Sequence, residues 1–265
     1  MWKYLFYSFF LTLCQFSVFS QDIEEYSKEY SFAVNLNTNG GLPAGVSFKY
    51  AKITDNPRLN TTYGIEIVSV RHPQEYKYSN PYLSNSQPFV RGKANYLYSF
   101  RFQFGKDAVL FRKALLEGVQ VNAVFAGGLS LGLLKPYAIR YDLSPSGSFG
   151  FVTKDVPFYN YDFSDADKFR ALYGVEMTED RIVGRGSFLE AWEGVKVVPG
   201  LNAKIGLAFE ASAFKHSITG IETGFTLEMF SEKMKVLNVN SLNEPVKNYQ
   251  TFAAMYLNFF FGARK

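Results

Sequence analysis

Apolar and polar side chains alternate along most of this chain beyond residue 30, in runs that are separated by turns. In the run over residues 95–104, Tyr96, Phe100 and Phe104 share one face, whereas Ser99 and Arg101 share the other. A period of two residues indicates β-strands whose two faces meet different surroundings. Eight such runs are present, over residues 31–37, 46–51, 63–68, 95–104, 119–133, 201–210, 220–229 and 254–261.

The surroundings of the two faces separate a soluble β-sandwich from a membrane barrel. One face of the runs is almost unbroken in apolar residues, and the chain holds 27 Phe and 18 Tyr against 2 Trp. The other face is small, polar or charged, which is typical of a transmembrane barrel and not of a sandwich core. Because lipid satisfies no backbone group, the sheet has to close. The pattern predicts an all-β fold, a closed antiparallel transmembrane β-barrel of eight strands, or ten if the segment 135–199 hides a strand pair.

The first twenty residues are typical of a secretory signal peptide. Lys3 is a positive n-region, Tyr4–Phe19 is apolar, and Ser20 is a small residue at the cleavage position. The single cysteine, Cys14, lies in this segment, and a lipoprotein reading of it is disfavoured by Leu13, where a small residue is required. The predicted organisation is a signal peptide over 1–20, a periplasmic tail over 21–30 and the barrel over 31–265.

Connection lengths predict the orientation in the bacterial outer membrane. Barrels of this class have short periplasmic turns and longer extracellular loops. The connections that fall on one side include the longest, residues 135–199, so this segment is predicted to be an extracellular loop and both termini to be periplasmic. Within it, residues 165–172 and 187–193 are candidate short helices.

Charged residues that fall on the inward face are predicted to neutralise one another. The interior of an eight-stranded barrel is filled by side chains, and a buried ion without a partner is too costly. We therefore expect a salt-bridge network that plugs the lumen, with a narrow ion path or a proton relay as the alternatives. The inward charges are Lys49, Glu66, Arg101, Lys204, Glu210, Glu222 and Glu228.

The long outer segment is rich in Tyr and Phe interleaved with polar residues, a composition typical of interaction surfaces. We expect it to be ordered and to present a contact surface to a protein partner or to lipopolysaccharide head groups. The residues predicted to form this surface are Tyr137, Tyr141, Phe158, Tyr159, Tyr161 and Phe163.

Candidate catalytic and metal-binding residues are few. His72, at the outer end of the third run, would need Asp142 or Ser144 beside it to act as a general base. The plainer interpretation is an exposed loop histidine next to Pro73, and His216 is expected to be solvated in a turn. No catalytic residue is assigned.

A second group of candidate ligands is acidic. Asp162, Asp165 and Asp167 form a cluster that could bind calcium, but it lacks the glycine and the distal glutamate of an EF-hand. No metal or cofactor is predicted. The net charge is +4, and no run of basic residues is longer than a pair, so nucleic acid is not an expected partner.

Four short motifs of the chain are distinctive: Gly127–Tyr137 (GGLSLGLLKPY), Leu110–Ala114 (LFRKA), Pro199–Lys204 (PGLNAK) and Gly262–Lys265 (GARK). Together they resemble a family of small outer-membrane β-barrel proteins found in Bacteroidota. The resemblance implies location and fold and transfers no catalytic residue. The expected function is a non-enzymatic scaffold or accessory subunit in outer-membrane lipid and lipopolysaccharide, docking another envelope component such as an assembly or secretion machine. A small channel is the alternative, and an enzyme at the outer rim is a third.

Overall fold

The computed structural model describes residues 27–54, 56, 58–83, 86–112, 118–144, 152–157, 166–176, 178–211, 216–238 and 246–265. The predicted signal peptide, with Cys14, lies outside the described residues. So do four residues of the predicted contact surface and two of the acidic cluster, which are Phe158, Tyr159, Tyr161, Phe163, Asp162 and Asp165.

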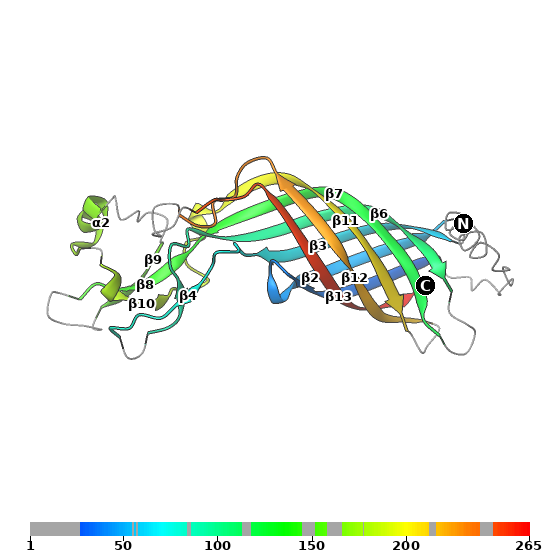
Figure 1. The fold of residues 1–265 in the computed structure, drawn as a ribbon, viewed down its shortest axis with the longest axis horizontal. Coiled ribbons are helices and arrows are strands. Elements are labelled where there is room, and N and C mark those ends of the chain that lie inside the picture. The colour runs from blue at the N-terminus through cyan, green and yellow to red at the C-terminus, as the bar shows by residue number, and fades with distance from the viewer. Residues whose placement is uncertain are drawn as a thin grey trace, which may run out of the picture.

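Eight antiparallel strands close into a barrel in the order β1-β13-β12-β11-β7-β6-β3-β2 (Figure 1). Each predicted run coincides with one barrel strand, apart from Val119, which precedes β7, so the predicted fold class and the count of eight are confirmed. The strands are β1 (Lys28–Asn37), β2 (Gly41–Ile53), β3 (Leu59–Val70), β6 (Asn95–Phe111), β7 (Gln120–Pro136), β11 (Lys196–Glu210), β12 (Ser217–Phe230) and β13 (Thr251–Arg264).

The strands extend past the predicted runs at their ends, because backbone pairing continues where the alternation of side chains fades. β1 begins at Lys28, so the predicted tail over 21–30 ends inside the barrel. The first strand pairs with both β2 and β13, which leaves no open sheet edge.

Large apolar side chains cover the outside of the barrel. Phe32 of β1 packs against Phe48 of β2 and Phe261 of β13, with ring centroids 4.9 and 6.3 Å apart. An exposed apolar surface that encircles the molecule is unfavourable in water and is solvated by a bilayer core. Other exposed members of this surface include Ile65, Phe102, Phe104, Phe125, Leu129, Leu201, Ile205, Phe225, Leu227 and Phe259.

The two ends of the barrel differ. The turns β2–β3, β6–β7 and β11–β12 are short and lie at one end, which we call the turn end; β1 starts and β13 stops there, where Lys28 N donates to Lys265 O at 2.9 Å. At the opposite end, the head end, smaller elements extend beyond the barrel (Figure 1). We call these elements the head: β4 (Lys77–Tyr78), β5 (Phe89–Val90), β8 (Ala138–Asp142), β9 (Thr153–Pro157), α2 (Ala166–Tyr173) and β10 (Ile182–Arg185).

The head is a small folded unit with its own core. Strands β10, β8 and β9 form one sheet and β4 pairs with β5. Side chains from both connections that supply these strands form a buried cluster of Phe89, Tyr137, Ile139, Tyr141, Val156, Phe169 and Ile182. The segment predicted as a loop over 135–199 therefore holds three strands outside the barrel, while β7 runs to Pro136 and β11 starts at Lys196.

The two predicted helices in this segment had different outcomes. The prediction for 165–172 is confirmed by α2 at Ala166–Tyr173, whereas 187–193 is not an α-helix. Only the 3₁₀ turn η4 (Trp192–Gly194) forms there, because Ala191 takes a left-handed conformation with φ 62° that interrupts a helix. None of the helices in the described residues has the length and apolarity needed to cross a bilayer.

Candidate functional site

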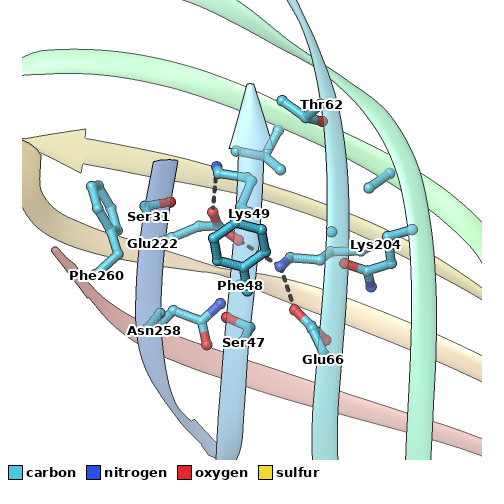
Figure 2. A pocket seen from close by; sticks show the side chains of 15 residues that line it. Ser31, Ser47, Phe48, Lys49, Thr62, Glu66, Lys204, Glu222, Asn258 and Phe260 are labelled. Atoms are coloured by element: carbon cyan, nitrogen blue, oxygen red, sulfur yellow. Dashed lines mark hydrogen bonds and ion pairs between the residues drawn. The ribbon is translucent and has the colours of Figure 1, made fainter. Parts of the chain in front are cut away.

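A chain of alternating charges crosses the middle of the lumen. Lys204 Nζ lies 2.7 Å from Glu66 Oε1 and 2.8 Å from Glu222 Oε1 (Figure 2). Lys49 Nζ lies 3.2 Å from Glu222 Oε2 and 3.0 Å from Asp107 Oδ2. Each ammonium therefore bridges two carboxylates that come from different strands, which ties β2, β3, β6, β11 and β12 together across the barrel.

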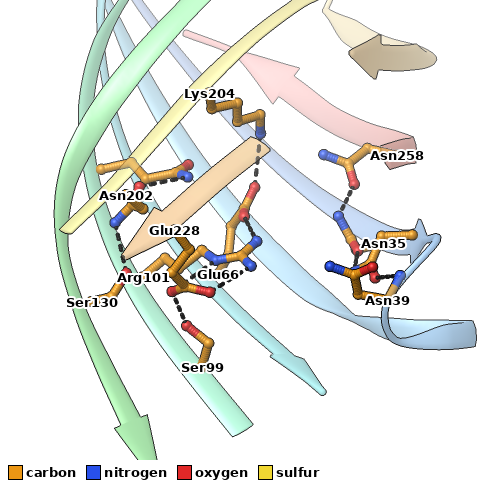
Figure 3. A network of polar contacts seen from close by, with 12 residues as sticks. Asn35, Asn39, Glu66, Ser99, Arg101, Ser130, Asn202, Lys204, Glu228 and Asn258 are labelled. Carbon is orange, nitrogen blue, oxygen red and sulfur yellow. Dashed lines mark hydrogen bonds and ion pairs between the residues drawn. The ribbon is translucent and has the colours of Figure 1, made fainter. Parts of the chain in front are cut away.

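Arg101 continues this chain toward the head end. Its Nη2 lies 2.9 Å from Glu228 Oε2 and its Nη1 lies 3.4 Å from Glu66 Oε2 (Figure 3). Ser99 Oγ donates a hydrogen bond to the same Glu228 carboxylate. The arginine and both glutamates are buried, so these charges depend on one another for neutralisation.

Strand register explains how residues far apart in the sequence meet. Glu66 of β3 lies directly opposite Arg101 of β6, and the other charges reach across the lumen from the same inward face. Their long side chains have room because small residues face inward between them. At Gly206, for example, a Cβ would collide with the hydroxyl of Tyr256, over whose ring Lys204 Nζ lies at 4.7 Å.

A separate cluster lies at the turn end. Arg264 donates to Glu29 at 2.7 Å and to Glu210 at 2.5 Å. Of the charges predicted to face inward, Glu210 belongs to this cluster, and the structure joins the other six in the central chain.

Three charged partners were missing from the prediction: Asp107, Arg264 and Glu29. Asp107 is six residues after Arg101 on the same strand, so it faces inward as Arg101 does. It lies past Phe104, where Gly105 and Lys106 obscure the alternation of apolar and polar residues. Arg264 likewise follows the last predicted run at the same parity. Extending each run by its parity would have found both residues.

Neutral polar side chains fill the space beside the charges. Asn35 donates to Asn258 at 2.7 Å (Figure 3). Gln103 donates to Asn202 at 3.2 Å. A cavity of about 30 Å³ remains between Lys49, Glu66, Lys204 and Glu222 (Figure 2). That space is enough for about two water molecules.

An apolar layer closes the lumen at the head end. The connection from β12 to β13 folds back over the barrel mouth, where Val236 O accepts hydrogen bonds from Ala94 N at 2.9 Å and Asn95 N at 3.1 Å. Met234 enters the barrel beside Gly132, where a Cβ would lie 2.6 Å from the methionine methyl carbon. We call this layer the apolar plug; it consists of Val68, Val70, Leu97, Leu134, Val198, Phe230, Met234, Val236 and Phe252.

Tyr137 and Tyr141 do not form a contact surface, so this part of the prediction is wrong. Both side chains lie inside the head core, at 1% and 0% exposure. The Tyr137 hydroxyl accepts from Val90 N at 3.0 Å, and the Tyr141 hydroxyl accepts from Thr178 N at 2.8 Å. Burial raises the pKa of each hydroxyl above its ordinary value. These tyrosines hold the head together because their rings are apolar while their hydroxyls satisfy buried backbone groups.

His72 is held by packing and backbone hydrogen bonds, whereas His216 is exposed. His72 is buried, contrary to the predicted exposed loop position, and its ring stacks on Tyr249. Its Nδ1 accepts from Gln74 N at 3.1 Å, which assigns the proton to Nε2 for donation to Lys247 O at 3.0 Å. His216 is exposed in a turn, as predicted.

Asp142 and Ser144 are paired with each other in the head, with Ser144 Oγ donating to Asp142 Oδ1 at 2.5 Å. Asp167, the described member of the predicted acidic cluster, is exposed on α2. Among the described residues, no group of three His, Cys, Asp or Glu side chains is placed to hold a metal ion.

Comparisons with known proteins give matches to solved structures only. No protein-family model matches the chain. No curated protein matches it either. It is similar to the attachment invasion locus protein Ail of Yersinia pestis, with 9% identity, a TM-score of 0.36, and coverage of 91% of this chain and 99% of that one. It is also similar to Neisserial surface protein A, with 8% identity, a TM-score of 0.35, and coverage of 90% and 95%.

Proposed function

We propose that this protein is an integral outer-membrane barrel that acts as a non-enzymatic docking scaffold. The barrel anchors the chain in the bilayer, and the head presents a binding surface to another envelope component, such as a larger assembly or secretion machine. The observation that carries this proposal is the contrast between the two parts: the lumen is filled, whereas the head has a core of its own and projects from the barrel.

The filled lumen disfavours the alternative of a channel. From the head end inward, a passing ion would meet the apolar plug and then the charge chain from Arg101 to Lys49. An ion in the plug would lose its hydration without gaining a partner. The charges below it are already paired with one another, so a passing ion would have to break these pairs.

We also propose that the head faces outside the cell and that both termini lie in the periplasm. Two observations support this orientation. The connections β2–β3, β6–β7 and β11–β12 are all short and lie at the end that holds the start of β1 and the stop of β13. At the other end only β1–β2, over residues 38–40, is short, and the remaining connections are long. This distribution is that of outer-membrane barrels with short periplasmic turns. The apolar exterior and the apolar segment at the start of the chain are consistent with export to that membrane.

The docking role is tested by crosslinking from the head in living cells. A photoreactive amino acid is placed at Tyr82 or Leu172, which are 78% and 68% exposed in the head, and in a control at Arg58 of the turn end. We expect a discrete adduct with an envelope component from the head positions and none from Arg58. The same component should fail to co-purify when residues 144–174 are deleted, a cut that spares all barrel strands.

Conductance tests the channel alternative independently. In planar bilayers, the refolded full chain is expected to give no regular steps. Regular conductance steps that persist in the deletion variant, together with the absence of head crosslinks, would contradict the scaffold and favour a channel.

A further inference from the structure

The outward face of the barrel carries an unusual cluster where β6 and β7 meet the head. Tyr96 and Tyr98 of β6 face outward, and Phe188 packs on them with ring centroids 6.4 and 6.1 Å away. Trp192 completes the cluster, 5.6 Å from the Phe188 ring. Phe188 and Trp192 belong to the turn that leads from β10 back to β11, so this turn lies on the outside of the barrel wall.

The turn exposes apolar side chains that continue the lipid-facing surface. Leu189 is 79% exposed, Phe188 50% and Trp192 47%. Just past the turn, β11 places Val197 opposite Leu133 of β7 on the outward face. The outward apolar face of β11 therefore leads from Val197 toward the turn. Trp and other aromatic residues at such a boundary are typical of the interface between acyl chains and head groups.

Lys135 fixes the turn against the barrel. Its side chain is buried, and Nζ donates to Glu190 O at 2.9 Å. The ammonium also lies over the rings of Phe188 at 4.8 Å and Trp192 at 5.2 Å. Cation–π contacts of a desolvated ammonium are favourable. The exposed apolar side chains of the turn are thus held in place by contacts from β7.

Two exposed guanidinium groups flank this aromatic cluster. Arg71 follows β3 two residues beyond Ser69, which lies opposite Tyr98, and Arg185 ends β10 three residues before Phe188. Within the described parts of the chain, neither guanidinium pairs with a carboxylate. Nearby cations are engaged: Lys93 pairs with Glu75 at 2.6 Å and Arg140 with Asp155 at 3.0 Å.

We propose that these residues form a binding site for a phosphate-bearing membrane lipid. Arg71 and Arg185 would bind the phosphate, while Phe188, Leu189 and Trp192 would lie among the upper acyl chains. Guanidinium groups match phosphate oxygens in charge and geometry, and the aromatic side chains hold them at the depth of the head groups. We call this set, with Tyr96, Tyr98 and Lys135, the lipid patch. The inference rests on the membrane-spanning barrel and not on the docking role of the head.

Trp192 provides the measurement. The Trp2→Phe variant leaves Trp192 as the only tryptophan, since the chain has 2. The full chain is reconstituted in phosphatidylcholine vesicles that contain brominated phosphatidylglycerol or, in parallel, brominated phosphatidylcholine. The extent to which each brominated lipid quenches Trp192 fluorescence gives the relative affinity of the two lipids for the patch. We expect strong quenching and a clear preference for phosphatidylglycerol over phosphatidylcholine. In Arg71→Gln/Arg185→Gln this preference should fall by about thirtyfold, because two basic groups near a charged surface are lost.

A charge-matched control separates site binding from net charge. Arg58→Gln/Arg170→Gln removes two exposed arginines outside the patch, at the turn end and on α2, and should keep the preference. Arg71→Lys/Arg185→Lys should retain part of it, because lysine keeps the charge without the planar fork. All variants are first checked for the folded, heat-modifiable barrel.

Three outcomes would overturn the lipid site. Weak quenching by both lipids would show that the turn does not enter the membrane. Equal quenching by both would remove the headgroup preference. Displacement of phosphatidylglycerol by inorganic phosphate would identify a site for free phosphate. None of these outcomes affects the crosslinking or conductance tests of the docking scaffold.

Discussion

At the scale of single residues, the lumen depends on pairs of charges that cannot be removed one at a time. The Glu228 carboxylate pairs with Arg101 and accepts a hydrogen bond from Ser99, so Arg101→Ala leaves a buried carboxylate without a counter-charge. Breaking a buried ion pair in this way costs about 3–5 kcal/mol. We predict a loss of that size in the unfolding free energy, measured by urea titration of the barrel in detergent micelles with gel migration as the readout.

A double variant of the same pair separates the effect of charge from the effect of packing. In Arg101→Met/Glu228→Gln both charges are gone and the amide still accepts from Ser99, so the double variant should be more stable than Arg101→Ala. Lys106→Ala, on the outward face of the same strand, should change stability by less than about 0.5 kcal/mol. Equal losses in the single and double variants would show that packing, and not charge pairing, determines the effect.

At the scale of elements, the head depends on two buried tyrosines whose protonated hydroxyls are part of its structure. An unfolded tyrosine ionises at a pH of about 10, whereas burial raises the pKa of Tyr137 and Tyr141. The stability that they contribute is therefore complete below pH 10 and is lost as the pH rises from there toward the folded pKa. We predict that the head unfolds in alkali while the barrel stays closed.

Near-ultraviolet circular dichroism would report the head, and heat-modifiable gel migration would report the barrel. In Tyr137→Phe/Tyr141→Phe the alkaline transition should shrink, although the lost hydrogen bonds cost about 1 kcal/mol each at neutral pH. An unchanged transition in this variant would assign the titration to other tyrosines.

At the scale of the whole molecule, orientation follows from which end carries the head. In a Cys14→Ser background, cysteine is introduced at Leu172, exposed on the head, or at Arg58 of the turn end. A membrane-impermeant maleimide on intact cells is expected to label Leu172→Cys and to leave Arg58→Cys unlabelled until the outer membrane is permeabilised. Ser144 is unsuitable for this purpose because its side chain is buried. The reverse labelling would place the head in the periplasm.

The sequence by itself determined the barrel strands and which of their faces point inward. Both are properties of a period of two along each strand, and a bilayer makes that period strict because one face meets lipid and the other meets the lumen. For this reason the inward positions of Glu66, Arg101 and Lys204 could be read from parity, without knowing which strands would pair.

Only the tertiary structure decided what those positions contact. Tyr137 and Tyr141 looked like surface residues because their neighbours are polar, but two connections pack together and bury them. The apolar plug similarly needs Met234 to fold back onto strands that are distant in the sequence, and the lipid patch needs the turn with Trp192 to lie against β6 and β7. Such contacts leave no local period in the sequence, because they join residues through the closure of the barrel and the packing of its longest connections.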